Sequence, residues 1–249
     1  MNRAYGPVVR LLDADPDLAE GLAGEARRQA TEMLQARVAV LPPGPWDPPG
    51  IGGAALGLLV LDGLMVRTVR LGRSSSTELL GPGDVLRPGD GVPPPLCPDP
   101  GEWRVLKETR VAVLDARVTA ALGHWPELTA AMCTRFLRRS RSLGYLMAAQ
   151  HFTRVADRLL VSLWHMASLW GRVTPEGTVV PFRLTHEMLA EIIGARRPTT
   201  TQAVIALEQQ GLIRRDERRC FILLGEPPHA ESAPAPVTLS ERVALAAAG

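Results

Sequence analysis

The alternation of apolar and polar residues divides the first half of the chain into a helical and a β part. From Pro16 to about Arg37, apolar residues recur every three or four positions, which predicts one or two helices, with Asp15 or Asp17 available to cap the start. From about Val38 to Asp115, short apolar runs alternate with clusters of Gly, Pro, Asp and Ser. That pattern is typical of an all-β sandwich or barrel, so we expect a β domain here.

Two Pro-rich segments interrupt the β region, from Pro42 to Gly53 and from Arg87 to Trp103. Pro and Gly at this density punctuate regular structure, because Pro lacks a backbone donor and Gly adopts turn conformations. We predict that both segments are loops that decorate the β domain.

A single long helix is predicted from about Glu127 to His151. Trp125-Pro126-Glu127 supplies a start signal, because Pro is favoured in the first helical turn. Apolar residues then follow at spacings of three and four, with Ser140 as the polar interruption. Since a long amphipathic helix commonly pairs with its own copy, we expect a dimer interface formed by Leu128, Met132, Phe136, Leu143 and Met147.

The other positions of this helix carry a cluster of arginines, namely Arg135, Arg138, Arg139 and Arg141. A charged helix face is most often exposed to solvent. We therefore predict a solvated face for these residues and no direct contact with nucleic acid. A second helix, ADRLLVSLWHMASLWG, is expected to end at Gly171, and GRVTPEGTVVPFRLT is predicted to form a hairpin with a turn at its PEG sequence.

The stretch LTHEMLAEIIGARRPTTTQAVIALEQQGLI, from Leu184 to Ile213, contains two short helical patterns. Thr185 can cap the first, Gly194 ends it, and a second runs from Arg197 to Gln209. Two short helices joined by a turn that contains Gly are typical of a helix-turn-helix unit. RRDERRCFILLG then predicts a small basic hairpin, the wing that often accompanies this unit.

The second helix of this unit begins with side chains suited to DNA. Arginine reads guanine edges and binds phosphates, and short hydroxyls bind backbone oxygens. Pro198 is tolerated because the first helical turn makes no internal use of its N–H. The predicted DNA-binding residues are Thr185, Arg196, Arg197, Pro198, Thr199, Thr200, Thr201 and Gln202, with Arg215 and Arg218 of the wing.

Composition narrows these interpretations only slightly. The formal net charge of the 249 residues is +2, so a nucleic-acid role depends on where positive charge lies and not on the total. The basic residues are Arg except for Lys107, which suits phosphate contacts but also fits the codon bias of a GC-rich genome. The three cysteines, Cys97, Cys133 and Cys220, form no CxxC pair, and no apolar run is long enough to cross a bilayer. We expect a soluble, cytoplasmic protein without metal or cofactor.

The stretch from Leu184 to Ile213 resembles, almost position by position, the helix-turn-helix of the Crp/Fnr superfamily of bacterial transcription regulators. ADRLL and GPGDVLRP are similar to other segments of that family. The resemblance implies a β-roll, a dimerisation helix and a winged helix, with base contacts at Arg197, Pro198 and Gln202. The family commonly has Glu at the second of these positions and Arg or Ser at the third, so the operator sequence cannot be carried over.

The resemblance is weaker in the sensory half. Cyclic-nucleotide binders of the family have a Gly-Glu pair and an Arg-Ser pair in a cassette that holds the phosphate, and RPGDGVPPPLCPDPGEWRVL shows no such cassette. An ungapped alignment places Leu143 and Gly144 where the family's adenine-contacting hydroxyls lie. Both differences argue against cyclic AMP or cyclic GMP. The effector stays open, since a haem ligand (His124, His151 or Cys97) or a redox-active Cys97 has only weak support.

Two other classes of function fit the sequence less well. A cupin-like enzyme would need clustered metal ligands, and residues 38–115 contain no His, so we predict no enzymatic activity. A regulator whose winged helix contacts a protein partner remains the alternative, although Arg197 and Gln202 argue for DNA.

The sequence thus predicts an α+β chain with an N-terminal β-roll (cupin-like jelly roll) and a C-terminal winged helix-turn-helix. The expected parts are residues 1–120 as an effector-like β-roll with N-terminal helices, 121–151 as the dimerisation helix, 152–226 as the winged helix and 227–249 as a flexible tail. The expected partners are double-stranded DNA and a second copy of the chain, with RNA polymerase as a candidate and the effector unknown.

Overall fold

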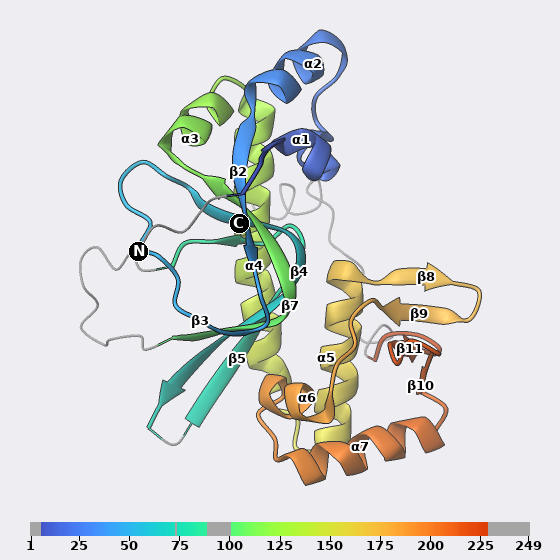
Figure 1. The fold of residues 1–249 in the computed structure, drawn as a ribbon. Helices are drawn as coiled ribbons and strands as arrows, with labels where there is room; N and C mark the ends of the chain where they lie inside the picture. Colours follow the sequence, from blue (N-terminus) through green and yellow to red (C-terminus); the bar gives the residue numbers. More distant parts are fainter. Residues whose placement is uncertain (1–5, 73, 89–100, 229–249) are drawn as a thin grey trace, which may run out of the picture.

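The computed structural model describes residues 6–72, 74–88 and 101–228 (Figure 1). It is a mixed α+β structure in which an N-terminal antiparallel sheet is followed by two long helices and a C-terminal winged helix. Cys97 and the predicted flexible tail from His229 onward lie outside the described residues. None of the helices within these ranges combines the length and the apolar character needed to span a bilayer.

The predicted helical region from Pro16 contains short helices as expected, but it ends earlier than about Arg37, because β2 begins at Gln35. Asp15 is the N-cap residue of η1, but its side chain makes no capping hydrogen bond, and Asp17 lies within the first turn of η1. Leu11, Leu12 and Leu18 are buried against the sheet and the long helix. The elements are β1 (Val8–Arg10), α1 (Leu11–Ala14), η1 (Pro16–Ala19) and α2 (Gly24–Met33).

The main sheet is antiparallel throughout, in the order β1-β2-β7-β4-β5, with β3 added to β7 and β6 to β4. The prediction that Pro42 to Gly53 is entirely loop is wrong, because β3 pairs with β7 there and Trp46 packs edge-on against Trp103. The strands are β2 (Gln35–Leu41), β3 (Gly44–Trp46), β4 (Gly57–Leu71), β5 (Ser74–Leu80), β6 (Val85–Leu86) and β7 (Glu102–Leu114).

The two longest strands, β4 and β7, bend where their register shifts between Val60 and Met65. Gly63 has a φ of +103° and its Cα faces Thr109 so closely that a Cβ would lie 2.4 Å from the Thr109 backbone. Buried Thr109 accepts a hydrogen bond from the Leu64 amide through Oγ1 (3.0 Å). A bulge of this kind requires Gly and re-aims the strand.

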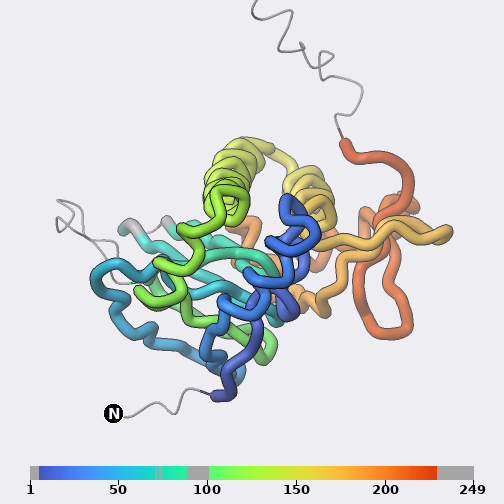
Figure 2. The backbone as a smooth tube through the Cα atoms, turned by 90° about the horizontal axis from the view of Figure 1, so that it is seen from above, coloured from blue at the N-terminus to red at the C-terminus, as the bar shows by residue number. Residues whose placement is uncertain are grey.

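Helix α3 (Ala116–Leu122) starts at Asp115, whose carboxylate accepts a hydrogen bond from the Val118 amide (3.0 Å). The predicted long helix is α4 (Pro126–Ala149), and α5 (Val155–Trp170) ends before Gly171 as expected. The view from above shows α4 and α5 running side by side, with the sheet against α4 (Figure 2).

The winged helix is built from α6 (His186–Ile192), α7 (Arg197–Gln209) and a second antiparallel sheet in the order β10-β11-β9-β8. Its strands are β8 (Arg172–Thr174), β9 (Gly177–Val180), β10 (Ile213–Arg215) and β11 (Phe221–Leu223). The hairpin β8–β9 and the wing β10–β11 both lie where the sequence predicts them.

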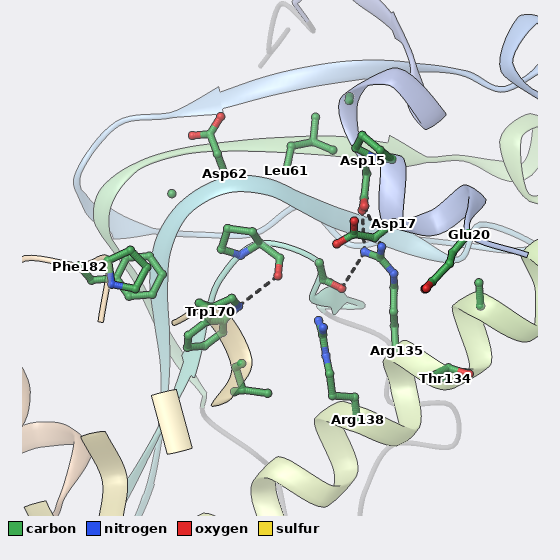
Figure 3. Close-up of a pocket in the computed structure, with 18 of the residues that line it drawn as sticks. Asp15, Asp17, Glu20, Leu61, Asp62, Thr134, Arg135, Arg138, Trp170 and Phe182 are labelled. Carbon is green, nitrogen blue, oxygen red and sulfur yellow. Dashed lines mark hydrogen bonds and ion pairs between the residues drawn. The ribbon is translucent and has the colours of Figure 1, made fainter. Parts of the chain in front are cut away.

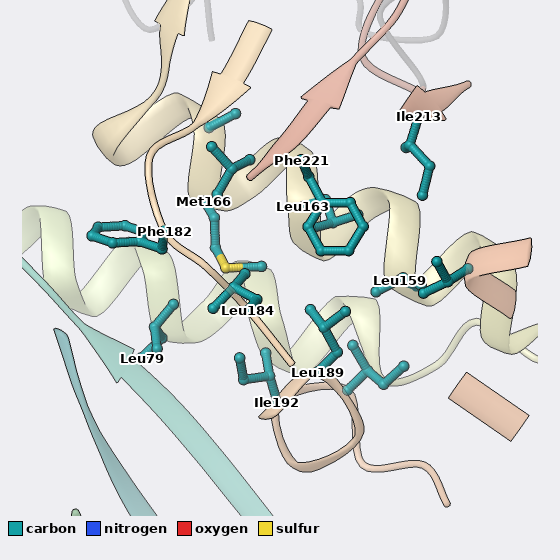
Figure 4. Close-up of a cluster of buried hydrophobic side chains, with 14 of the residues drawn as sticks. Leu79, Leu159, Leu163, Met166, Phe182, Leu184, Leu189, Ile192, Ile213 and Phe221 are labelled. Carbon is teal, nitrogen blue, oxygen red and sulfur yellow. The ribbon is translucent and has the colours of Figure 1, made fainter. Parts of the chain in front are cut away.

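The core of the winged helix extends into the β domain. Leu79 on β5 belongs to the same buried cluster as Phe182, Leu184 and Ile192 (Figure 4). Leu64 and Val66 of β4 belong to it too, and Arg104 of β7 forms an ion pair with Glu191 of α6. The winged helix therefore packs against the sheet through apolar side chains, which fixes its orientation in this structure.

Candidate nucleic-acid interface

The turn between α6 and α7 has the geometry of a helix-turn-helix. Thr185 caps α6, with its hydroxyl accepting a hydrogen bond from the Met188 amide (3.2 Å). Gly194 ends the helix with a φ of +61°, a conformation that favours glycine. Buried Leu189 and Ile192 of α6 and Val204 and Leu207 of α7 belong to one apolar core, which holds the two helices together.

The first turns of α7 present a polar, basic surface to solvent. The helix starts at Arg197, with Pro198 in its first turn as predicted. Helix N-termini also attract phosphate, because their free N–H groups carry partial positive charge. The exposed residues are Arg196, Arg197, Pro198, Thr199 and Gln202, and Thr201 is partly exposed.

Thr200 does not belong to this surface. Its side chain is fully buried, and its hydroxyl donates a hydrogen bond to the Arg196 carbonyl (3.1 Å). The prediction that Thr200 contacts DNA is therefore wrong. On a helix that packs through Ala203, Val204 and Leu207, the position three residues before Ala203 faces the core.

The wing carries the remaining predicted residues. Arg218 is exposed at the tip between β10 and β11, where Arg219 has a φ of +62°. Arg215 is partly buried, and its guanidinium lies 4.6 Å above the Phe221 ring and donates a hydrogen bond to His186 (2.7 Å). Arg215 thus connects β10 with β11 and α6 inside the winged helix, and its predicted DNA contact stays a prediction.

The exposed side of α4 is a candidate surface for a second copy of the chain. Phe136, Leu143 and Met147 are exposed there, Met147 to 68%. Leu128 and Met132 are buried against α1, α3 and the sheet instead, so their assignment to a dimer interface is wrong. The sequence places them on the same stripe, but the N-terminal helices cover the first turns of α4.

The arginines on the inner side of α4 are not solvated, contrary to the sequence prediction. Arg135 forms a two-pronged ion pair with Asp15 (2.6 and 2.7 Å) and donates a hydrogen bond to the Gly83 carbonyl. Arg139 binds Glu78 on β5 (2.6 and 2.9 Å) and the Val85 carbonyl.

Arg138 lies 3.5 Å from Asp84, and burial raises the pKa of Asp84 above its ordinary value. Sequence patterns did not predict any of these three ion pairs, because the partners lie 54 to 120 residues apart in the chain. Arg141, by contrast, is exposed as expected.

These ion pairs close the gap between α4 and strands β5 and β6. The space left there is about 10 Å³ and is lined by Glu78, Asp84, Arg138 and Arg139, among others. A small-molecule site has a volume of roughly 300 to 1,000 Å³. The chain's own side chains therefore fill the part of the junction where α4 meets β5 and β6.

A larger cavity of about 970 Å³ lies between the N-terminal helices, α4 and the end of α5 (Figure 3). Its walls include Asp17 and Glu20 on one side and Trp170 on the other, with Arg138 between them. The Trp170 indole donates a hydrogen bond to the Pro82 carbonyl (3.1 Å) and packs edge-on against Phe182. The cavity thus borders both the β domain and the start of the winged helix.

The described residues contain no group of three or more His, Cys, Asp or Glu side chains arranged for a metal ion. His124 interacts through Nδ1 with the Ala120 and Ala121 carbonyls, and His151 is exposed at the end of α4.

The chain combines an antiparallel β domain, a long helix and a winged helix-turn-helix, and comparison with known proteins places this architecture. Residues 153–226 match the family model of the Crp-like helix-turn-helix domain. A CRP-like cAMP-activated global transcriptional regulator from Mycobacterium tuberculosis (strain ATCC 25618 / H37Rv) is 26% identical over 155 residues, which cover 61% of this chain and 67% of the relative.

Solved structures agree with this classification. The structure of a CooA mutant from Carboxydothermus hydrogenoformans superposes with a TM-score of 0.60 at 16% identity, covering 86% of this chain and 91% of that one. A cyclic nucleotide-binding domain containing protein from Listeria monocytogenes EGD-e gives 0.58 at 13% identity, covering 74% and 87%. The chain therefore has the fold of a Crp/Fnr-type transcription regulator, with a Crp-like helix-turn-helix domain.

Proposed function

We propose that this protein is a sequence-specific transcription regulator that binds double-stranded DNA as a homodimer. The observation that carries the proposal is the exposed, basic N-terminal end of α7, which a wing flanks. An α-helix fits the major groove, and an Arg at its start can form two hydrogen bonds with a guanine edge. Arg197 and Gln202 are the base-reading residues in this proposal, while Arg196, Thr199 and Arg218 bind phosphates.

The homodimer rests on the exposed apolar face of α4. Phe136, Leu143 and Met147 lie on one side of the helix, and exposed Gly144 leaves open space around its Cα. Two copies that pack these faces together are related by a two-fold axis. Their α7 helices then read a two-fold symmetric site with half-sites roughly 34 Å apart, one helical turn of DNA.

We further propose that the effector is not a cyclic nucleotide. The M. tuberculosis relative is described as cAMP-activated, but the segment from Arg87 to Leu106 of this chain has no phosphate cassette of the family's type. The contact of α4 with β5 and β6 is closed by Arg138 and Arg139 and leaves about 10 Å³. The cavity beside Trp170 is the better candidate for an effector, because it adjoins the Phe182 segment that leads into α6.

On this proposal the protein acts in the cytoplasm on DNA and is not an enzyme. The test is selection of bound duplexes from a random pool by the ligand-free protein at two salt concentrations, read by sequencing. Enrichment of a two-fold symmetric motif supports the proposal. Binding that depends on salt but enriches no motif contradicts sequence-specific recognition, because phosphate contacts alone give such behaviour.

A further inference from the structure

A chain of hydrogen bonds connects the wing to the start of α7. Arg215 of β10 donates through a guanidinium N–H to Nε2 of His186, the first residue of α6 (2.7 Å). Nδ1 of the same ring lies 3.0 Å from the Thr201 hydroxyl. The Thr201 hydroxyl in turn lies 3.0 Å from the carbonyl of Arg197, the first residue of α7.

The direction of these bonds follows from the chemistry of the groups. A guanidinium can only donate, so Nε2 of His186 must accept and carry no proton. The proton of the neutral ring then sits on Nδ1 and is donated to Thr201. The Thr201 hydroxyl uses its own hydrogen for the Arg197 carbonyl, so each group has one defined role.

We propose that His186 is a positioning residue of the DNA-reading surface, whose neutral ring ties the wing to the first turn of α7 and whose protonation lowers the discrimination between DNA sequences. This inference rests on the proposed function. Thr201 lies between Arg197 and Gln202 on α7, so movement of this turn displaces both. Small displacements of base-reading side chains are costly, because hydrogen bonds weaken steeply with distance and angle.

Protonation is incompatible with the observed contacts. An imidazolium carries N–H groups on both nitrogens, and its Nε2–H would point at the Arg215 guanidinium, where two donors and two positive charges meet. Arg215 would keep the Phe221 ring and the carboxylate of Glu208, whose oxygen lies 3.7 Å from its Nε. The link between β10 and His186 would be lost.

The charged groups that act on the ring come from two elements, namely Arg215 of β10 with Glu208 and Arg197 of α7. Burial lowers the pKa of His186 below its ordinary 6.5, the charges of Arg215 and Arg197 lower it further, and Glu208 opposes them. Because this pKa is lowered, the His186 ring of the folded protein is neutral above pH 6.5. The contact is fully present above 6.5 and is lost only as the pH falls through the lowered pKa of His186 in the folded protein.

The test compares the affinities of the full-length dimer for its selected duplex and for a scrambled duplex, measured by fluorescence anisotropy at constant ionic strength. The ratio of the two is the readout, because an added positive charge raises phosphate affinity on both duplexes alike. We expect this ratio to fall about three- to tenfold as the pH is lowered from about 7.5 through the lowered pKa of His186, the effect of losing one partly exposed hydrogen bond to a charged group.

Two variants identify the group responsible. His186→Gln keeps an acceptor for Arg215 but cannot titrate, so its ratio should not change with pH. His151→Gln alters an exposed histidine outside the winged helix and should retain the pH dependence of the unaltered protein. Thr201→Val removes the middle hydroxyl and should lower the ratio at neutral pH.

The outcomes separate the inference from the proposed function. A ratio that falls with pH equally in the His186→Gln variant overturns the inference, as does a ratio that is large and independent of pH in the unaltered protein. A ratio of one at every pH contradicts the proposed function itself. Nitrogen NMR of the free protein gives a reading without DNA, because a proton on Nε2 at neutral pH would exclude the described hydrogen-bond chain.

Discussion

Removing Arg135 should destabilise the protein more than any exposed arginine does. Its guanidinium and the Asp15 carboxylate are only 9% and 11% exposed, and two hydrogen bonds of 2.6 and 2.7 Å join them. Arg135→Met keeps the aliphatic stem but leaves Asp15 charged, buried and unpaired. Breaking a buried ion pair by removing one partner costs about 3 to 5 kcal/mol, so we expect a loss of about 3 kcal/mol in the free energy of unfolding.

The assay is urea unfolding followed by circular dichroism at neutral pH. A double-mutant cycle with Asp15→Asn isolates the pair, and the double variant should be less destabilised than the sum of the single ones by about 2 kcal/mol. Arg28→Met is the matched control, because Arg28 and its partner Glu25 are 71% and 63% exposed. That change should cost less than about 0.5 kcal/mol.

The reasoning would be refuted if Arg135→Met cost less than about 1 kcal/mol or if the two substitutions were additive within about 0.3 kcal/mol. Either result would mean that solvent reaches the pair and that the N-terminal helices do not depend on α4 for their position. It would also mean that the Arg135–Asp15 ion pair does not help to hold α4 in place, which would leave the pairs of Arg138 and Arg139.

Three further predictions concern the surfaces of the winged helix and of α4. Arg197→Ala should weaken binding to the selected duplex by about 1 to 3 kcal/mol and relax the preference at one base pair, and an equal loss on all duplexes would instead mark Arg197 as a phosphate contact. Thr200→Val should lower the unfolding free energy by about 0.5 to 1.5 kcal/mol while the folded protein keeps its DNA affinity, as isothermal titration can check. Phe136→Asp should shift the protein to monomers in sedimentation velocity. Leu128→Ala should cost about 2 to 5 kcal/mol of stability and leave the dimer intact. A monomeric Leu128→Ala variant would contradict the assigned surfaces.

The winged helix could be predicted from sequence because its signals are local. The cap at Thr185 and the left-handed Gly194 act within a few residues of the elements they delimit. The same holds for Gly171 after α5 and for the hairpins on either side of the two-helix unit. Such features depend on backbone conformation and capping, which the residue type largely decides.

The environment of α4 could not be predicted, because it is set by distant parts of the chain. The same apolar stripe contains Leu128, which the N-terminal helices bury, and Met147, which stays exposed. Periodicity gives the face of a helix but not what covers it. Arg135 likewise pairs with Asp15, which lies between α1 and η1, and Arg139 pairs with Glu78 on β5; no spacing rule connects these residues in the sequence.

In the candidate DNA-binding surface, too, local features could be predicted from the sequence and contacts between distant residues could not. Arg196, Arg197 and Gln202 are exposed at the start of α7, as the helix pattern required. Thr200 is buried although it lies among them, because the helical period turns every third or fourth residue inward. The role of His186 had no sequence signal, since its partners Thr201 and Arg215 are 15 and 29 residues away.

The number of chains on one duplex tests the central claim most directly. Sedimentation of the protein with a labelled duplex that carries the selected site should give two chains per duplex, and deletion of one half-site should weaken binding by several orders of magnitude in salt near physiological strength. One chain per duplex, or equal affinity for the full site and the half-site, would contradict a homodimer that reads a symmetric operator.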